Sequence, residues 1–538
     1  MRITRDRASS ASRVRGADDS PGQHRQLLGA GLLLLTFSLG FLVARQGWHQ
    51  LLIDGVTRFI RQPVAAVTAL LQPPDAPTLT VDLAFRDYDR LLDIRDQALR
   101  LGVNVATEEG AVPATIQHAD STVEVSLRLP PGPAQPLAGE TWPLEVVVQG
   151  DDALFDLRRF LLRPAAEDAL RTMGYLEALR QAGHVVPRTH VVRLSLNGSD
   201  KGRYILLEQP AAEMLAAQDR QDSALVTFDP GAYWAAAARL GQALPGSGFQ
   251  YARVTLIPPV DAVDSPLSPE SSAARREASD LLQALSDGAV QPADALDVER
   301  TASLLAMTAL WHGAPELDWR GLTFIYNPTS GRLEPVAPIG PPAPVAPVPD
   351  LLMSDPRLQV ALVRAIKALS QPDVLSELQT DLAPQIAQFQ GALGTAEAPW
   401  PSLSGHQTVM RHQIAPSPIL FATRYPGRPG LILRLDNVQP FPVEIVGLDV
   451  GENLFLPVDP AWVVEPAKAP LVDSVEGVVL NAAVGSIART VYLQVPPAAL
   501  STGTPPVGEV QVVARLFGLE AQHVVAATTH PEPAADVP

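Results

Sequence analysis

The sequence contains no cysteine, and lysine is nearly absent. Of its 41 basic residues, only Lys201, Lys367 and Lys468 are lysines. Without cysteine the chain has no disulfide and no thiolate nucleophile or metal ligand, which excludes a small fold held together by disulfides. The preference for arginine, with abundant alanine, leucine and proline, is typical of a bacterium with a GC-rich genome.

Positive charge is also scarce overall. The formal net charge of −17 excludes nucleic acid as a partner bound through the overall field of the protein. Histidines at metal-site spacing, a G-x-S-x-G motif and a Walker A motif are all absent from the sequence, so we predict no metal-binding residues. With 538 residues, 46% of them hydrophobic, the chain is long enough for several domains with sizeable cores.

One long uncharged run lies near the N-terminus, at residues 27–44. Eighteen helical residues span about 27 Å, enough for a hydrocarbon core. Six arginines and three aspartates precede the run, which favours a cytoplasmic N-terminus. We therefore expect one transmembrane helix in a bacterial cytoplasmic membrane, with the bulk of the chain periplasmic or extracellular. A cleaved signal peptide and a buried core helix are the alternatives.

Local patterns beyond this run predict mixed α and β structure. Residues 87–102 show helical spacing and end at a glycine, and residues 189–196 and 203–207 alternate around an Asn-Gly turn. After Pro399 the alternation of period two predicts a β-sandwich. The expected organisation is a basic cytoplasmic tail (1–26), a transmembrane helix (27–45), a juxtamembrane stalk (46–75), a main domain (76–395, with a linker at 335–350), a β-sandwich domain (415–525) and a disordered tail (526–538).

Four stretches of the main domain resemble the CotH kinase family, which comprises atypical kinases first associated with spore coat proteins. The most specific is GHVVPRTHVVRLSLNGSDKGRYILLEQPAAEML, and a second is LDWRGLTFIYNPTSGRLEPV. DIRDQALRLG and FDLRRFLLRPAAEDALRTMGYLEALRQA support them by their order. The resemblance implies an atypical-kinase-like two-lobed α+β domain. The expected fold class is therefore α+β, with the transmembrane helix before this domain and the C-terminal β-sandwich after it.

The resemblance also implies roles for individual residues. Asp318 stands at the position of the catalytic aspartate of the family. Arg128 and Glu208 stand at nucleotide-binding positions. Phosphoryl transfer needs cations on the phosphates, oxygen ligands for magnesium and a carboxylate base. Asp318 is therefore the one residue that could still support phosphoryl transfer.

The sequence departs from the family at the other chemical positions. The two lysines are replaced by Pro130 and Thr141, the metal-binding asparagine by Gly321 and the magnesium aspartate by Ile339. We therefore expect a pseudokinase that needs no cofactor and binds an envelope protein or polysaccharide. One alternative is a divergent active kinase that uses ATP and magnesium to phosphorylate Ser/Thr of envelope or secreted proteins. Another is an anchored protein unrelated to kinases.

Overall fold

The computed structural model describes residues 76–218, 220, 223–242, 244, 248–258, 269–313, 317–338, 355–426, 430–451, 455–464, 478–482, 488–500 and 509–531. The predicted tail, transmembrane helix and stalk, residues 1–75, lie outside these ranges, as does most of the predicted linker. Within these ranges, no helix has both the length and the apolar character needed to cross a membrane.

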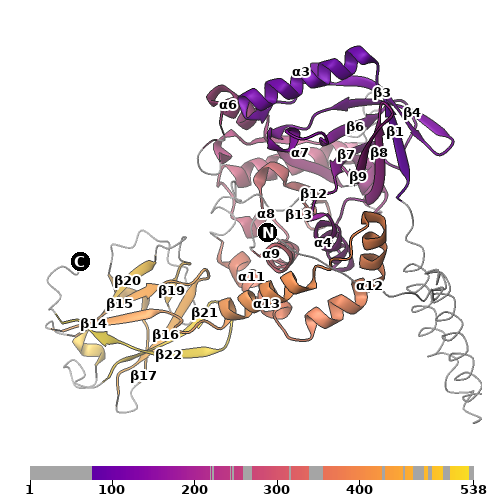
Figure 1. Ribbon diagram of the computed structural model, residues 1–538. Helices are drawn as coiled ribbons and strands as arrows, with labels where there is room; N and C mark the ends of the chain where they lie inside the picture. Colours follow the sequence, from indigo (N-terminus) through magenta and orange to yellow (C-terminus); the bar gives the residue numbers. More distant parts are fainter. Residues whose placement is uncertain are drawn as a thin grey trace, which may run out of the picture. The chain divides into compact units, whose positions relative to one another are not determined.

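The first part of the described chain is a closed barrel of seven strands (Figure 1). Its strand order is β1-β3-β4-β6-β7-β9-β8, and the parallel pairing of β1 with β8 closes it. Alternate residues such as Val125, Leu127 and Phe160 point into a buried core. The strands are β1 (Thr78–Asp82), β3 (Val112–His118), β4 (Ser121–Arg128), β6 (Leu144–Val148), β7 (Arg159–Pro164), β8 (Thr189–Leu196) and β9 (Ser199–Glu208).

Two predicted local features of the barrel are confirmed. Helix α3 (Phe85–Leu101) ends at Gly102, whose φ of 74° is the left-handed conformation that glycine adopts without strain. β8 and β9 form an antiparallel hairpin joined by Asn197 and Gly198, both with positive φ. After α3, the short strand β2 (Val103–Asn104) pairs with β5 (Gly132–Pro133).

A second, antiparallel sheet has the order β11-β10-β12-β13 and lies among helices. Helix α9 is the most buried of the helices beside this sheet. Gly174 of α4 packs directly on α9, because a Cβ there would come within 2.7 Å of the Trp311 ring. The strands are β10 (Ala224–Asp229), β11 (Arg253–Leu256), β12 (Thr323–Asn327) and β13 (Arg332–Pro335). The helices are α4 (Ala169–Gln181), α5 (Ala212–Ala216), α6 (Gly231–Leu240), α7 (Pro269–Ser286), α8 (Pro292–Ala295), α9 (Val298–His312), α11 (Pro356–Leu369), α12 (Val374–Leu393) and α13 (Trp400–Ile414).

The C-terminal part is rich in β-structure. One sheet has the order β18-β20-β15-β14-β23, and the other has the order β17-β16-β21-β22 with β19 also paired to β16. Both contribute buried residues, such as Leu433 and Ile445, to one apolar cluster, which is compatible with the predicted β-sandwich. The strands are β14 (Phe421–Tyr425), β15 (Leu431–Asn437), β16 (Val443–Asp449), β17 (Phe455–Pro457), β18 (Val463–Val464), β19 (Val478–Leu480), β20 (Arg489–Val495), β21 (Gln511–Leu516), β22 (Gln522–Ala526) and β23 (Thr528–Thr529).

The fold class predicted from the sequence, a transmembrane helix with an atypical-kinase-like two-lobed domain, is wrong. The mixture of α and β structure is present, but the N-terminal strands close into a seven-stranded barrel. None of the described helices can serve as the transmembrane element. Closure depends on the pairing of Thr78 with Arg193, two residues far apart in the chain, and no local pattern encodes such a pairing.

Candidate functional site

Asp318, the predicted catalytic residue, is fully engaged by its neighbour Arg320. It precedes the 3₁₀-helix η4 (Trp319–Gly321) and accepts a hydrogen bond from the backbone N–H of Arg320 at 3.0 Å. Nε of Arg320 lies 2.9 Å from Oδ1 and 3.0 Å from Oδ2, and Nη2 also donates to Oδ2. The guanidinium lies 4.9 Å from the ring centroid of Trp234 and 5.1 Å from that of Tyr233. Both carboxylate oxygens therefore face a cation that two aromatic rings hold in place.

Glu208, a predicted nucleotide-binding residue, is also paired internally. It is the last residue of β9 and only 2% exposed. Arg188 donates from Nε to Oε2 at 3.0 Å and from Nη2 to Oε1 at 2.6 Å, and its backbone N–H donates to Oε2 at 2.9 Å. This hydrogen bonding raises the pKa of Arg188. The pair has the bidentate geometry that makes arginine–carboxylate contacts strong.

Arg128, the other predicted nucleotide-binding residue, is only partly neutralised. It ends β4 directly opposite Glu145 of β6, and its Nε donates to the Glu145 carboxylate. Gln209 donates to the other oxygen of that carboxylate at 3.1 Å. The Glu145 side chain is 10% exposed and that of Arg128 is 39% exposed. Among the described residues, the Nη atoms of Arg128 have no hydrogen-bond partner, so part of its donor capacity remains available.

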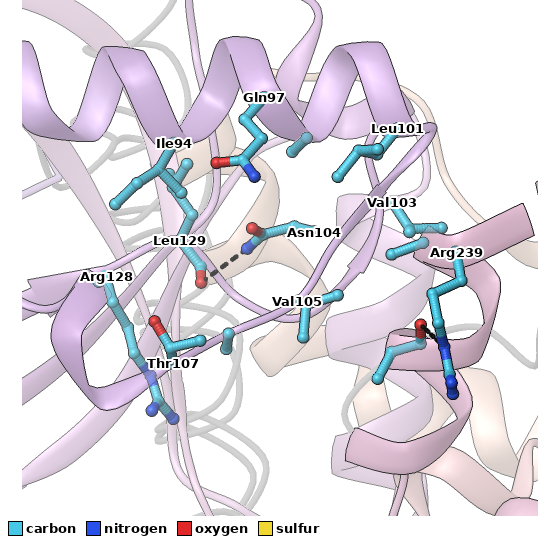
Figure 2. Close-up of a pocket in the computed structure, with 15 residues that line it drawn as sticks. Ile94, Gln97, Leu101, Val103, Asn104, Val105, Thr107, Arg128, Leu129 and Arg239 are labelled. Atoms are coloured by element: carbon cyan, nitrogen blue, oxygen red, sulfur yellow. Dashed lines mark hydrogen bonds between the residues drawn. The ribbon is translucent and has the colours of Figure 1, made fainter. Parts of the chain in front are cut away.

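Arg128 lines a pocket of 560 Å³, which we call the α3–α6 pocket. In Figure 2, α3 runs along one side, and Arg128 and Arg239 lie on opposite sides with their guanidinium groups pointing the same way. Its walls are mostly apolar, and none of the residues that line it is acidic. They are Ile94, Gln97, Ala98, Leu101, Val103, Asn104, Val105, Ala106, Thr107, Gly110, Arg128, Leu129, Ala235, Ala238 and Arg239.

The three predicted site residues do not meet in this pocket. Arg128 lines it, whereas Glu208 and Asp318 are not among its lining residues. Helix α6 nevertheless takes part in both places. Its residues 233 and 234 hold Arg320 beside Asp318, and its last turns carry Arg239 into the pocket wall. The predicted base, Asp318, therefore lies apart from Arg128, the predicted nucleotide-binding residue that has free donors.

Glu334, from the L-E-P stretch of the resemblance, forms a buried charge network. It lies on β13 and is 3% exposed. Asn327 donates to Oε1 at 2.7 Å and Arg220 to Oε2 at 2.6 Å, while Nε of Arg300 lies 3.4 Å from Oε2. Burial alone would raise the pKa of Glu334, but these donors and charges lower it overall. The carboxylate is therefore held ionised by structural partners.

His184 lies beside this network and stays neutral. It is 5% exposed, and its Nε2 lies 3.0 Å from the Ser303 hydroxyl oxygen. Its Nδ1 is buried and has no hydrogen-bond partner in the described part of the chain. Burial first, and the charge of Arg300 second, lower the pKa of His184 to about 4. This histidine is thus a structural residue that resists protonation.

The residues present do not fit the magnesium ion that active members of the family would need. Magnesium requires several oxygen ligands in an octahedral arrangement. Both Asp318 oxygens face Arg320, Gly321 offers no side-chain ligand, and Ile339 lies outside the described residues. In the part of the chain that the structure describes, no three histidine or acidic side chains are grouped so that they would hold a metal. The described residues therefore offer no magnesium site that could support phosphoryl transfer.

Comparison with known protein families finds no family model that matches this chain. No curated protein matches it either. The resemblance to CotH kinases thus remains a prediction from the motifs, and the description of the site depends on the geometry alone.

Sequence reasoning missed the arginines that decide this geometry. Arg188 stands in the P-R pair of the most specific stretch, so the motif itself held a signal for the partner of Glu208. Arg320 is two residues from Asp318, a spacing at which a side chain can reach back to the cap of a 3₁₀ turn. Arg239 had no comparable signal, because it is simply a basic residue in the last turn of a helix.

Proposed function

We propose that this chain is a CotH-kinase-like pseudokinase, a binding or scaffold module of the bacterial envelope that does not transfer phosphate. The observation that supports this most is the engagement of Asp318. A general base must be free to accept a proton from the substrate hydroxyl. Here the carboxylate accepts from the backbone and the guanidinium of Arg320, whose position over Trp234 and Tyr233 opposes its release.

The pairing of Glu208 supports the same proposal. In a kinase-like site this glutamate would orient a lysine toward the phosphates of the nucleotide. Its two oxygens are instead occupied by Arg188, and no lysine precedes Lys201 in the sequence. The motif carboxylates therefore act as fold-supporting ion pairs, which suits a module that presents surfaces and pockets to partners.

The test is a phosphate-transfer assay with the full chain, radiolabelled ATP and either magnesium or manganese. The chain itself and an envelope extract serve as acceptors. We expect no transfer above background for the natural sequence, and the same for Asp318→Ala. Asp229→Asn is the matched control, because Asp229 caps the N–H of Gly231 and pairs with no arginine among the described residues. Transfer by the natural chain that is lost in Asp318→Ala and kept in Asp229→Asn would establish the divergent active kinase instead.

A further inference from the structure

The α3–α6 pocket has the composition of a binding site for a small organic anion. Its volume of 560 Å³ lies within the range of small-molecule sites. Ile94, Ala98 and Leu101 of α3 form one apolar side, and Leu129 and Ala238 extend the apolar lining. Such a surface accepts the hydrocarbon or ring part of a ligand and releases ordered water when it is covered.

The polar groups of the pocket favour negative charge. Arg239 is exposed, and the one hydrogen bond that it makes within the described part of the chain is from Nε to the carbonyl of Ala235 at 3.3 Å. Arg128 uses its Nε on Glu145 and keeps its Nη atoms available. No acidic residue lines the pocket, although the chain carries a net charge of −17. Arg239 is thus a guanidinium without a carboxylate partner among the described residues of an acidic protein, and Arg128, which pairs with Glu145, is a second and partly neutralised one.

We infer that the α3–α6 pocket binds an organic anion, with its apolar body against α3 and its phosphate or carboxylate group at Arg239, while Arg128 adds a second positive charge to the opposite wall. Arginine recognises both groups through paired N–H donors. Figure 2 shows the two side chains on opposite sides of the pocket, so Arg239 provides the contact for the anion on the α6 side. This inference rests on the proposed function, because it gives the binding module a class of ligand.

The experiment measures binding to the full chain by isothermal titration calorimetry with four probes. Octyl phosphate carries both halves of the ligand, octanol only the apolar half, inorganic phosphate only the anion, and octylammonium the opposite charge. We expect octyl phosphate to bind at least about tenfold more tightly than each of the others, since both halves contribute. Equal binding of octanol or of inorganic phosphate would overturn the inference, because only one half would then be recognised.

Variants place the binding in this pocket. Arg239→Gln should weaken octyl phosphate binding by about tenfold through the loss of a charged donor. Gln97→Trp, at an exposed position of α3 that lines the pocket, should abolish binding by filling the space. Arg100→Gln is the matched control, because Arg100 is an exposed arginine in the last turn of the same helix and does not line the pocket.

The outcomes separate this inference from the proposed function. If Arg239→Gln and Gln97→Trp bind octyl phosphate as the natural chain does, the pocket is not the site and the inference fails, whatever the phosphate-transfer assay gives. If the chain transfers phosphate while the probes and variants behave as expected, the proposed function fails and the anion site stands. Circular dichroism of each variant confirms that a loss of binding is not a loss of folding.

Discussion

Charged side chains are arranged in opposite ways in two regions of this molecule. At the motif positions, Asp318, Glu208 and Glu334 are each matched by arginines that their own fold supplies. In the α3–α6 pocket, Arg239 has no carboxylate partner among the described residues, and Arg128 shares only one nitrogen with Glu145. The acidic residues of the motifs are therefore paired within the fold, while the arginine without a carboxylate partner, Arg239, lies outside the motifs.

The two regions also differ in exposure to solvent. The side chains of Glu208 and Glu334 are 3% and 4% exposed, whereas Arg239 lies on the surface of α6. A buried ion pair that loses one partner leaves an uncompensated charge in a medium of low dielectric constant. Removal of Arg239, which is exposed and has no carboxylate partner among the described residues, leaves no buried charge unpaired. Substitutions in the first region should therefore reduce stability, and substitution of Arg239 should reduce binding.

The largest effect is expected for Glu334→Ala. Arg220 and Arg300 would face each other without their shared carboxylate, and Asn327 would lose its acceptor. We expect the free energy of unfolding to fall by about 3–5 kcal/mol, as measured by chemical denaturation. Asp96→Asn is the control, since Asp96 belongs to an exposed pair with Arg95, and its loss should not be measurable. If Glu334→Ala lowered the free energy of unfolding by less than about 1 kcal/mol, the charge network would not be a main source of stability in this region.

The features that were predictable from the sequence are the local ones. Gly102 ends α3 and Asn197-Gly198 joins β8 to β9, because asparagine and, above all, glycine without a Cβ tolerate the positive φ that these positions require. Asp318 and Glu208 could be selected as candidates by their motifs, but their pairing depends on where arginines lie after folding. Closure of the barrel by β1 and β8 has no local signal at all.

The α3–α6 pocket shows even more clearly that non-local features cannot be predicted from local sequence patterns. It combines α3, the end of β4 and the last turns of α6, three segments that are separated in the chain. Arg128 was found through the resemblance, but its companion Arg239 lies more than a hundred residues away on a helix of ordinary amphipathic character. Sites made from distant segments become visible only when the tertiary structure places them together.

A smaller, pH-dependent effect is expected from His184. Its folded pKa of about 4 lies below the ordinary value of 6.5, so the unfolded chain binds its proton more readily. Stability is thus fully present above pH 6.5 and declines as the pH falls toward 4, by about 1.4 kcal/mol per pH unit within this window. Asp297 and Glu334 oppose the shift, and Arg300 adds to it.

Denaturation of the natural chain and of His184→Gln at pH 7 and pH 5 measures this contribution. The variant should lose less stability between the two pH values than the natural chain, because glutamine does not titrate. His523→Gln, on β22 in the C-terminal region, should keep the natural difference. If His184→Gln shows the same decline as the natural chain, the acid sensitivity comes from other groups.

The smallest effect on stability is expected for Arg239→Gln, and it provides the sharpest comparison of the two regions. Because Arg239 is exposed and pairs with no carboxylate in the part of the chain that the structure describes, the free energy of unfolding should change by less than about 0.5 kcal/mol. Arg220→Gln also removes one positive charge, but Arg220 is the partner of buried Glu334. This substitution should lower the free energy of unfolding by about 1–3 kcal/mol. Octyl phosphate binding should show the opposite order, weakened by Arg239→Gln and unchanged by Arg220→Gln. If both variants lost stability and binding to the same extent, the comparison would fail. The buried ion pairs would then not be purely structural, and the α3–α6 pocket would not be purely a binding site.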